Sequence, residues 1–289
     1  DVFRSSIRAW KKVIQMYVLE NTDFLIRMMP EIEFVTKATE LLVKLKNKGC
    51  NLVSPVIAPM AEKKFTAKAL CNPIVASKLD TPVIPNDFSF DDDGMIYVLT
   101  GPNRGGKSVI TCAVGIAFVM AQLGLPVCAD ECVISPCDQI FTHFPTGSED
   151  TIDKGRLGEE CSRLGAIFEE VTEDSLVLLD ESLSSTGSFE GAYIASEVLQ
   201  GFSMVRCRGI FSTHLHDLAA SVDEINAACV PKGGVKIDNL VAAIDKGSRS
   251  FKILRARPDG KSYARDIAEK YGLSLAHILS RVQKNTAAK

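Results

Sequence analysis

Apolar residues recur at three- and four-residue intervals through the first fifty residues, in two successive sets. The first set is Ile7, Trp10, Val13, Ile14 and Tyr17, and the second is Ile32, Val35, Ala38, Leu41, Leu42 and Leu45. A single apolar stripe at this spacing is typical of an amphipathic helix. We therefore predict two helices before residue 50, the second of which ends at the glycine of Asn47-Lys48-Gly49.

The pattern changes between residues 94 and 220, where short apolar runs alternate with longer helical stretches. Runs such as Met95–Leu99 and Leu176–Leu179 are apolar on both faces, which is typical of parallel strands buried between helices. The alternation predicts an α/β fold with a doubly wound, mixed or parallel sheet flanked by helices.

The segments on either side of this core have weaker patterns. Five prolines between residues 55 and 85 predict a turn-rich stretch of short strands. Strand-like runs follow the core within Val235–Leu254, and two short helices are predicted at Ser262–Lys270 and Ser274–Gln283.

A phosphate-binding motif follows the first strand of the core. The residues are Gly101, Pro102, Asn103, Arg104, Gly105, Gly106, Lys107 and Ser108, which fit G-x-x-x-x-G-K-[ST] between a strand and a helix. The glycines let backbone N–H groups turn toward phosphates at the positive end of the helix. Lys107 would reach the β- and γ-phosphates, and the Ser108 hydroxyl would bind Mg²⁺. The motif predicts that the chain binds a nucleoside triphosphate.

Two carboxylates, Asp180 and Glu181, come directly after the apolar run at Leu176–Leu179. Ligands of open α/β sheets bind at the carboxyl ends of the strands, so both side chains are expected beside the phosphate loop. Asp180 suits a direct or indirect role in Mg²⁺ binding. Glu181 suits a general base that polarises the attacking water.

A histidine follows the next strand, Gly209–Thr213. His214 could contact the γ-phosphate or the attacking water, and the alternative is a solvated loop histidine. For His216 the solvated role is the favoured one, because no third ligand with zinc spacing is present. The order of phosphate loop, Asp-Glu pair and histidine is that of ABC-type ATPases, in which two nucleotide domains enclose ATP.

Across roughly residues 30–285 the chain resembles the ATPase domain of the MutS family of DNA mismatch repair proteins. The matching segments are Thr100–Ser108 (family T-G-P-N-M-G-G-K-S), Met120–Glu131 (M-A-Q-I-G-x-x-V-P-A-E), Ile140–Thr142 (I-F-T-R), Asp150 with Gly155-Arg156 (D-x-x-x-x-G-R), Ser175–Glu181 (S-L-V-L-L-D-E), Ser212–Leu218 (A-T-H-Y-H-E-L) and Lys261–Ala268 (S-Y-A/G-x-x-I/V-A).

The resemblance implies an organisation and a function. Residues 1–64 would form a helical segment at the end of the lever region, and residues 65–289 the ABC-type ATPase domain with C-terminal helices at 261–285. Hydrolysis of ATP with Mg²⁺ would drive closure of a dimer and motion of DNA-clamp domains in mismatch repair or related DNA maintenance. The alternative is another ABC-type mechanical ATPase, or a binding-only nucleotide switch that acts on a protein or RNA partner.

The resemblance also implies partners and a base site. A second copy or a MutS-like partner would bind through the ATPase domain. Mismatched or branched double-stranded DNA would bind through other domains, which are absent from this chain. The family often places an aromatic residue at the adenine. Val83 and Ile84 hold that place here, which predicts apolar contact with the base without stacking.

Two segments depart from the family pattern and indicate a divergent paralogue. The family's L-G-R-G-T-S-T-x-x-G becomes residues 182–191 of this chain, where the Gly-Arg-Gly is lost. Its G-R-S, whose serine reaches the nucleotide of the partner subunit, becomes Gly155-Arg156-Leu157. Leucine cannot donate that hydrogen bond.

Composition excludes some classes and leaves others open. Thirty-three basic and thirty-six acidic residues give a net charge of −3, so no basic stripe for gripping DNA is evident. No apolar segment is long enough to span a membrane, and no signal peptide is visible. Nine scattered cysteines without paired spacing predict reduced thiols and a cytoplasmic location.

Overall fold

The computed structural model describes residues 2–145, 155–184, 187–245, 248–258, 271–275 and 277–279. The chain divides into two compact units, Asp1–Gly49 and Cys50–Lys289. Among the described residues, no helix is both long enough and apolar enough to cross a membrane.

The first unit is one helix, α1, which spans Val2–Asn47 and contains Pro30. The sequence predicted two helices here, but no glycine interrupts residues 1–48, and the helix continues through the single proline. The predicted glycine stop is present, since Gly49 has a left-handed φ of 81°. Residues 50–64, which the sequence assigned to the helical segment, contain the strand β1 (Val56–Ile57) and the 3-10 helix η1 (Met60–Glu62).

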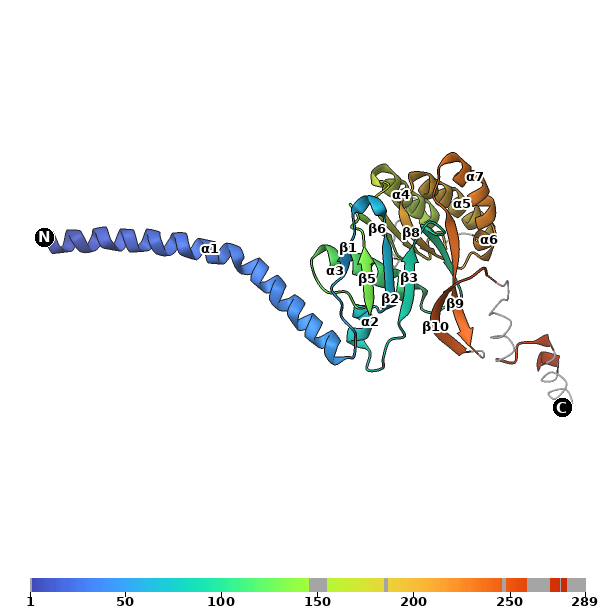
Figure 1. The fold of residues 1–289 in the computed structure, drawn as a ribbon, viewed down its shortest axis with the longest axis horizontal. Coiled ribbons are helices and arrows are strands. Elements are labelled where there is room, and N and C mark those ends of the chain that lie inside the picture. Colours follow the sequence, from blue (N-terminus) through green and yellow to red (C-terminus); the bar gives the residue numbers. More distant parts are fainter. Residues whose placement is uncertain are drawn as a thin grey trace. The chain divides into compact units, whose positions relative to one another are not determined.

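The second unit contains two sheets (Figure 1). The smaller sheet has the order β1-β5-β2-β3, and the larger has the order β10-β9-β4-β8-β7-β6. The remaining strands are β2 (Phe65–Leu70), β3 (Asn86–Phe90), β4 (Ile96–Thr100), β5 (Glu131–Ile134), β6 (Ile140–His143), β7 (Leu176–Asp180), β8 (Arg208–Ser212), β9 (Ile237–Asp245) and β10 (Ser248–Arg255). The helices are α2 (Pro73–Lys78), α3 (Lys107–Gln122), α4 (Gly155–Glu170), α5 (Ser188–Val205), α6 (His216–Ala220), α7 (Val222–Cys229) and the 3-10 helix η2 (Val230–Lys232).

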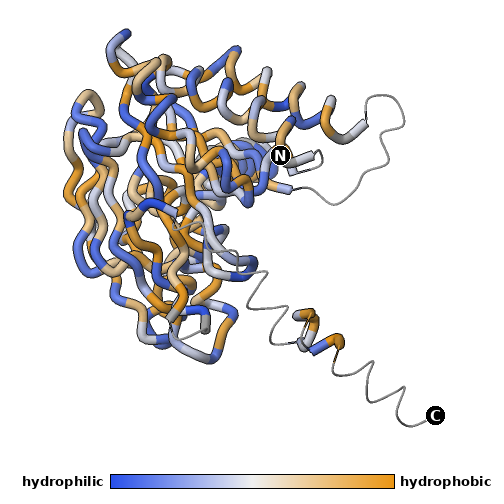
Figure 2. The backbone as a smooth tube through the Cα atoms, turned by 90° about the vertical axis from the view of Figure 1, so that its right-hand side faces the viewer, coloured by the Kyte–Doolittle hydropathy of each residue, from blue (hydrophilic) through white to orange (hydrophobic). Residues whose placement is uncertain are grey.

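Helices cover both faces of the larger sheet. Helices α4, α5, α6 and α7 lie together over one face (Figure 1), where they share a core with β4, β7, β8 and β9. Helix α3 packs on the other face so closely that a side chain on Gly115 would collide with Leu178 of β7. Phe118 of α3 meets Phe65 of the smaller sheet at a ring distance of 5.0 Å. In Figure 2 the apolar segments gather inside this unit. The predicted α/β class is confirmed.

The larger sheet extends further along the chain than the sequence indicated. The predicted core ended near residue 220, but β9 pairs in parallel with β4, and β10 then pairs antiparallel with β9. Strand β9 carries Asp238 and Asn239 near its start and Asp245 at its end, so only the run Leu240–Ile244 has the wholly apolar pattern of a central parallel strand. Most of the two predicted C-terminal helices lies outside the described residues, as do Asp150 and the matched segment Lys261–Ala268.

Candidate active site

The phosphate loop runs from the end of β4 into the first turn of α3. Two of its glycines have left-handed φ values, 138° at Gly101 and 99° at Gly106. A side chain on Gly101 would also lie 2.7 Å from Ala242 of β9, so the neighbouring strand excludes any larger residue there. Gly106 caps α3, and the N–H groups of that first turn have no partner within the helix. The loop therefore presents donors at the positive end of α3.

Lys107 is the only lysine of this loop and is almost completely buried, with 4% of its surface exposed. Its Nζ donates to the carbonyl oxygens of Gly101 at 3.0 Å and Pro102 at 3.3 Å. Burial lowers the pKa of Lys107, and the charges of Glu181 and Asp180 oppose that shift. The ammonium group is thus held by the loop carbonyls, and the charges of the two carboxylates act on it.

Asp180 and Ser108 are the residues predicted to hold Mg²⁺. Asp180 is buried, and its Oδ1 has no hydrogen-bond partner among the described residues. The pKa of Cys112 is raised by burial and then by the charge of Asp180, so this carboxylate faces α3 near Cys112. Ser108 lies four residues earlier, on the same side of the helix.

This arrangement fits a hard cation that prefers oxygen ligands. One carboxylate and one hydroxyl supply only part of an octahedral shell, so phosphate oxygens and water would supply the rest. Consistent with that incomplete set, no group of three or more His, Cys, Asp or Glu residues that could hold a metal occurs in the described part of the chain.

Glu181 and His214 are in direct contact. Glu181 Oε1 lies 2.7 Å from His214 Nε2, and both side chains are about one third exposed. The backbone of Glu181 has a left-handed φ of 51°, and its N–H donates to the carbonyl of Ser212 at 2.8 Å. His216 instead begins helix α6 and is exposed. The carboxylate can therefore accept a proton from a water molecule while the histidine fixes its orientation.

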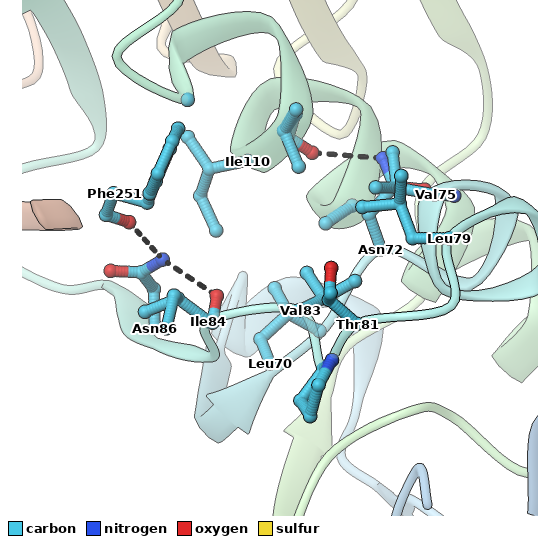
Figure 3. Close-up of a pocket in the computed structure, with 14 residues that line it drawn as sticks. Leu70, Asn72, Val75, Leu79, Thr81, Val83, Ile84, Asn86, Ile110 and Phe251 are labelled. Atoms are coloured by element: carbon cyan, nitrogen blue, oxygen red, sulfur yellow. Dashed lines mark hydrogen bonds between the residues drawn. The ribbon is translucent and has the colours of Figure 1, made fainter. Parts of the chain in front are cut away.

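An apolar pocket of about 420 Å³ adjoins the phosphate loop. Figure 3 shows its lining, with Phe251 at one end and Leu79 at the other. Val83 and Ile84, the residues predicted to contact the base, line it together with Gly106 of the loop. A planar base bound here would have its phosphates at the N-terminus of α3.

The sequence did not indicate Phe251, which brings an aromatic ring into this pocket from β10. Its φ is 57°, and the register between β9 and β10 shifts at this point. Asn86 holds the distorted backbone, because its Nδ2 donates to the Phe251 carbonyl at 3.1 Å and its Oδ1 accepts from the Ile253 N–H at 2.7 Å. The same Nδ2 also donates to the carbonyl of Ile84 at 3.4 Å, so one side chain joins both walls of the pocket (Figure 3).

Leu157, which stands where the resemblance expects an interfacial serine, lies on α4 and packs against the core between the sheet and helices α4–α7. In the second altered segment, Leu183 is completely buried in the same core, and Gly187 precedes helix α5. Residues 185 and 186 lie outside the described range. In both segments the leucine contributes apolar packing within this subunit.

The fold and the loop together define a P-loop nucleotide-binding domain. A model of the protein family described as MutS domain V matches residues 97–286. The match covers more than half of the chain, and the chain belongs to this family.

Curated proteins show the same similarity over parts of their length. The chain is 34% identical to the DNA mismatch repair protein MutS of Prochlorococcus marinus (strain MIT 9312) over 174 residues, or 58% of this chain and 19% of that protein. It is 41% identical to the DNA mismatch repair protein Msh6 of Gallus gallus over 145 residues, or 47% of this chain and 11% of that protein. It is 31% identical to the DNA mismatch repair protein MutS of Methanothrix thermoacetophila over 239 residues, or 81% of this chain and 26% of that protein. The chain thus spans about a quarter or less of each relative.

The packing of Leu157 leads to a stability prediction. Replacing Leu157 by Ser should lower the free energy of unfolding by about 1–2 kcal/mol, because apolar contacts with the core are lost and a hydroxyl is partly buried. Chemical denaturation measures this change. Leu123→Ser is the control, since that side chain is 52% exposed and its replacement should cost less than about 0.5 kcal/mol. Equal effects of the two substitutions would contradict the packing of Leu157.

Proposed function

We propose that this chain is the ATP-binding and ATP-hydrolysing part of a divergent MutS-like DNA repair protein. The observation that carries the proposal is the buried Lys107 ammonium, which the carbonyls of Gly101 and Pro102 hold at the N-terminus of α3. A lysine in a glycine loop at a helix N-terminus has the surroundings of a phosphate ligand.

The binding step follows from these contacts. The phosphates would bind the N–H groups at the start of α3, with Lys107 Nζ exchanging its carbonyl partners for the β- and γ-oxygens. The adenine would enter the pocket between Val83, Ile84 and Phe251. Ser108 and Asp180 would hold Mg²⁺, which neutralises phosphate charge when bound.

Hydrolysis then requires a base for the attacking water. Glu181 is the carboxylate that extends beyond the strand end, and it is partly exposed where Asp180 is buried. The hydrogen bond from His214 to Oε1 leaves the other carboxylate oxygen to accept a proton. His214 orients the base through this bond.

The partners are part of the same proposal. The MutS relatives are named as DNA mismatch repair proteins, and we extend that role to the whole protein to which this chain belongs. A second copy or a MutS-like partner would close over the nucleotide, and the DNA would bind through other domains, which agrees with the net charge of −3 here. The single, scattered cysteines predict a reducing compartment such as the cytoplasm.

A nucleotide switch without turnover is the second candidate. It rests on the altered segments at 155–157 and 182–191, which lack the family's serine and its Gly-Arg-Gly. The intact pair of Glu181 and His214 favours hydrolysis.

Two substitutions separate binding from hydrolysis. Lys107→Ala should weaken ATP binding by about a hundredfold or more, because charge-assisted hydrogen bonds to two phosphates are lost. Glu181→Gln should bind ATP like the parent and hydrolyse it about 10²–10⁴-fold more slowly, because the shape remains and the base is removed. Calorimetric titration and phosphate release measure the two effects, with Lys68→Ala on the surface of β2 as the control. Unchanged turnover in Glu181→Gln would assign the base elsewhere.

The aromatic wall of the pocket can be tested on its own. Phe251→Ala should weaken ATP binding by about tenfold, since stacking of a base on an aromatic ring is worth about 1–3 kcal/mol. Phe251→Trp should retain the affinity. Leu254→Ala, three residues along β10 and 53% exposed, controls for changes in the strand. If Phe251→Ala and Leu254→Ala behave alike, the ring does not contact the base.

Oligomerisation gives a third test. The Glu181→Gln chain should sediment as a dimer with ATP and Mg²⁺ and as a weaker dimer or a monomer with ADP, because a γ-phosphate enclosed by two subunits stabilises their contact. In the parent chain, turnover should rise faster than linearly with protein concentration. A monomer under both nucleotide conditions would contradict the enclosed site for this chain.

A further inference from the structure

A buried histidine and a buried serine meet one residue beyond Glu181. His143 Nδ1 lies 2.7 Å from Ser182 Oγ, and the side chains are 3% and 2% exposed. The serine hydroxyl is also 3.4 Å from the carbonyl oxygen of His143. The sequence did not indicate either residue as a site residue. They lie 39 residues apart in the chain, and neither belongs to the phosphate loop.

The contact joins two neighbouring strand ends. His143 is the last residue of β6, and Ser182 lies in the turn that follows β7. The two strands are parallel, with His143 in register with Leu179. The hydrogen bond therefore lies at the same sheet edge as the carboxylates, on the β6 side.

The turn that it joins is strained. Glu181 and Leu183 both have left-handed backbones, with φ values of 51° and 62°. This conformation is unfavourable for residues that carry a Cβ, and it persists only where surrounding contacts enforce it. The position of the Glu181 carboxylate is therefore set by the contacts of the turn.

Those contacts come from both sides of β7. On the β8 side, the carbonyl of Ser212 accepts from the Glu181 N–H, and His214 contacts the carboxylate. Leu183 is held by the core below. On the β6 side, the polar contact with the turn is the one between His143 and Ser182. Without it, the hydrogen bonds that the described residues make to the turn would come from the β8 side only.

The surroundings of the ring leave it no other polar role among the described residues. His143 Nε2 is buried and has no hydrogen-bond partner there. Burial lowers the pKa of His143, and the positive charge of Arg163 lowers it further, so the ring is neutral near pH 7. One ring nitrogen, Nε2, is buried without a hydrogen bond to a described residue. The other, Nδ1, is hydrogen-bonded to Ser182, as is usual for a buried polar atom.

We propose that His143 is a positioning residue for ATP hydrolysis, which holds the Glu181 carboxylate in place through its hydrogen bond to Ser182. The inference rests on the proposed function, because it takes Glu181 to be the base. His143 itself touches neither the nucleotide loop nor the carboxylate in any contact that the structure shows. Its effect is on the geometry of the turn.

The test compares kcat and ATP affinity in variants that remove or restore this bond. His143→Leu and Ser182→Ala should each lower kcat by about 10- to 100-fold, which is the loss expected when a catalytic group is displaced by about 1 Å. The affinity for ATP should remain that of the parent, since Lys107 and the pocket are untouched. His143→Asn places an amide near the position of Nδ1 and should restore much of the turnover. The double variant should be no slower than the slower single variant, because both lose the same bond.

Ser175→Ala is the matched control. Ser175 is also completely buried, and its Oγ donates to Asp138 Oδ1 at 2.8 Å. This bond joins the segments that precede β6 and β7, at the opposite ends of the same two strands. Ser175→Ala should therefore lose stability as Ser182→Ala does and keep the kcat of the parent.

Three results of these activity and affinity measurements would overturn the proposal. They are parent-like kcat in Ser182→Ala, an ATP affinity that falls as much as kcat, and a Ser175→Ala variant that is slowed equally. If His143→Leu does not fold, Ser182→Ala and His143→Asn decide the question. A parent chain without turnover would contradict the proposed function instead. Crystal structures of the parent and Ser182→Ala then test positioning separately, and a retained 2.7 Å contact between Glu181 and His214 in the variant would overturn it.

Discussion

Parallel pairing of four strands brings distant parts of the chain to one sheet edge. Strand β4 pairs with β8, β8 with β7 and β7 with β6, and in that ladder Asp180 lies opposite Ser212. The phosphate loop leaves the end of β4, Glu181 the end of β7, and His214 the end of β8. These ends are separated by tens of residues, so the hydrogen-bonded register between the strands places the ammonium, the carboxylates and the imidazole together.

The parts of the site that could be predicted from the sequence are local ones. A phosphate loop is one continuous segment, and its glycines allow the backbone conformation that it needs. The positive φ values at Gly101 and Gly106 illustrate this. The wholly apolar run before Asp180 and the shorter apolar stretch Gly209–Phe211 before His214 indicate buried strands. Because the strands are parallel, the polar residues that follow them lie at the same end of the sheet, beyond the carboxyl ends of the strands.

The parts that the sequence did not indicate depend on pairing across long distances. Phe251 lines the pocket at an irregularity in the pairing of β9 and β10. Asn86, 165 residues earlier, donates a hydrogen bond to the Phe251 carbonyl. The contact of His143 with Ser182 depends on the register of β6 with β7. Leu157 stands where the family resemblance expects a serine, but on helix α4 its side chain packs against the core of the same subunit. The placements of Phe251, His143 and Ser182 leave no periodic signal in the residues concerned, whereas Leu157 shares the helical spacing of Cys161, Leu164 and Phe168 on α4.

The two walls of the apolar pocket come from distant parts of the second unit's sequence, with Val83 early and Phe251 late. During synthesis from the N-terminus, the phosphate loop is complete long before the strand that carries the ring has been made. The apolar pocket is complete only when β9 has paired with β4 and β10 with β9, so its formation requires the last strands of the described part of the chain.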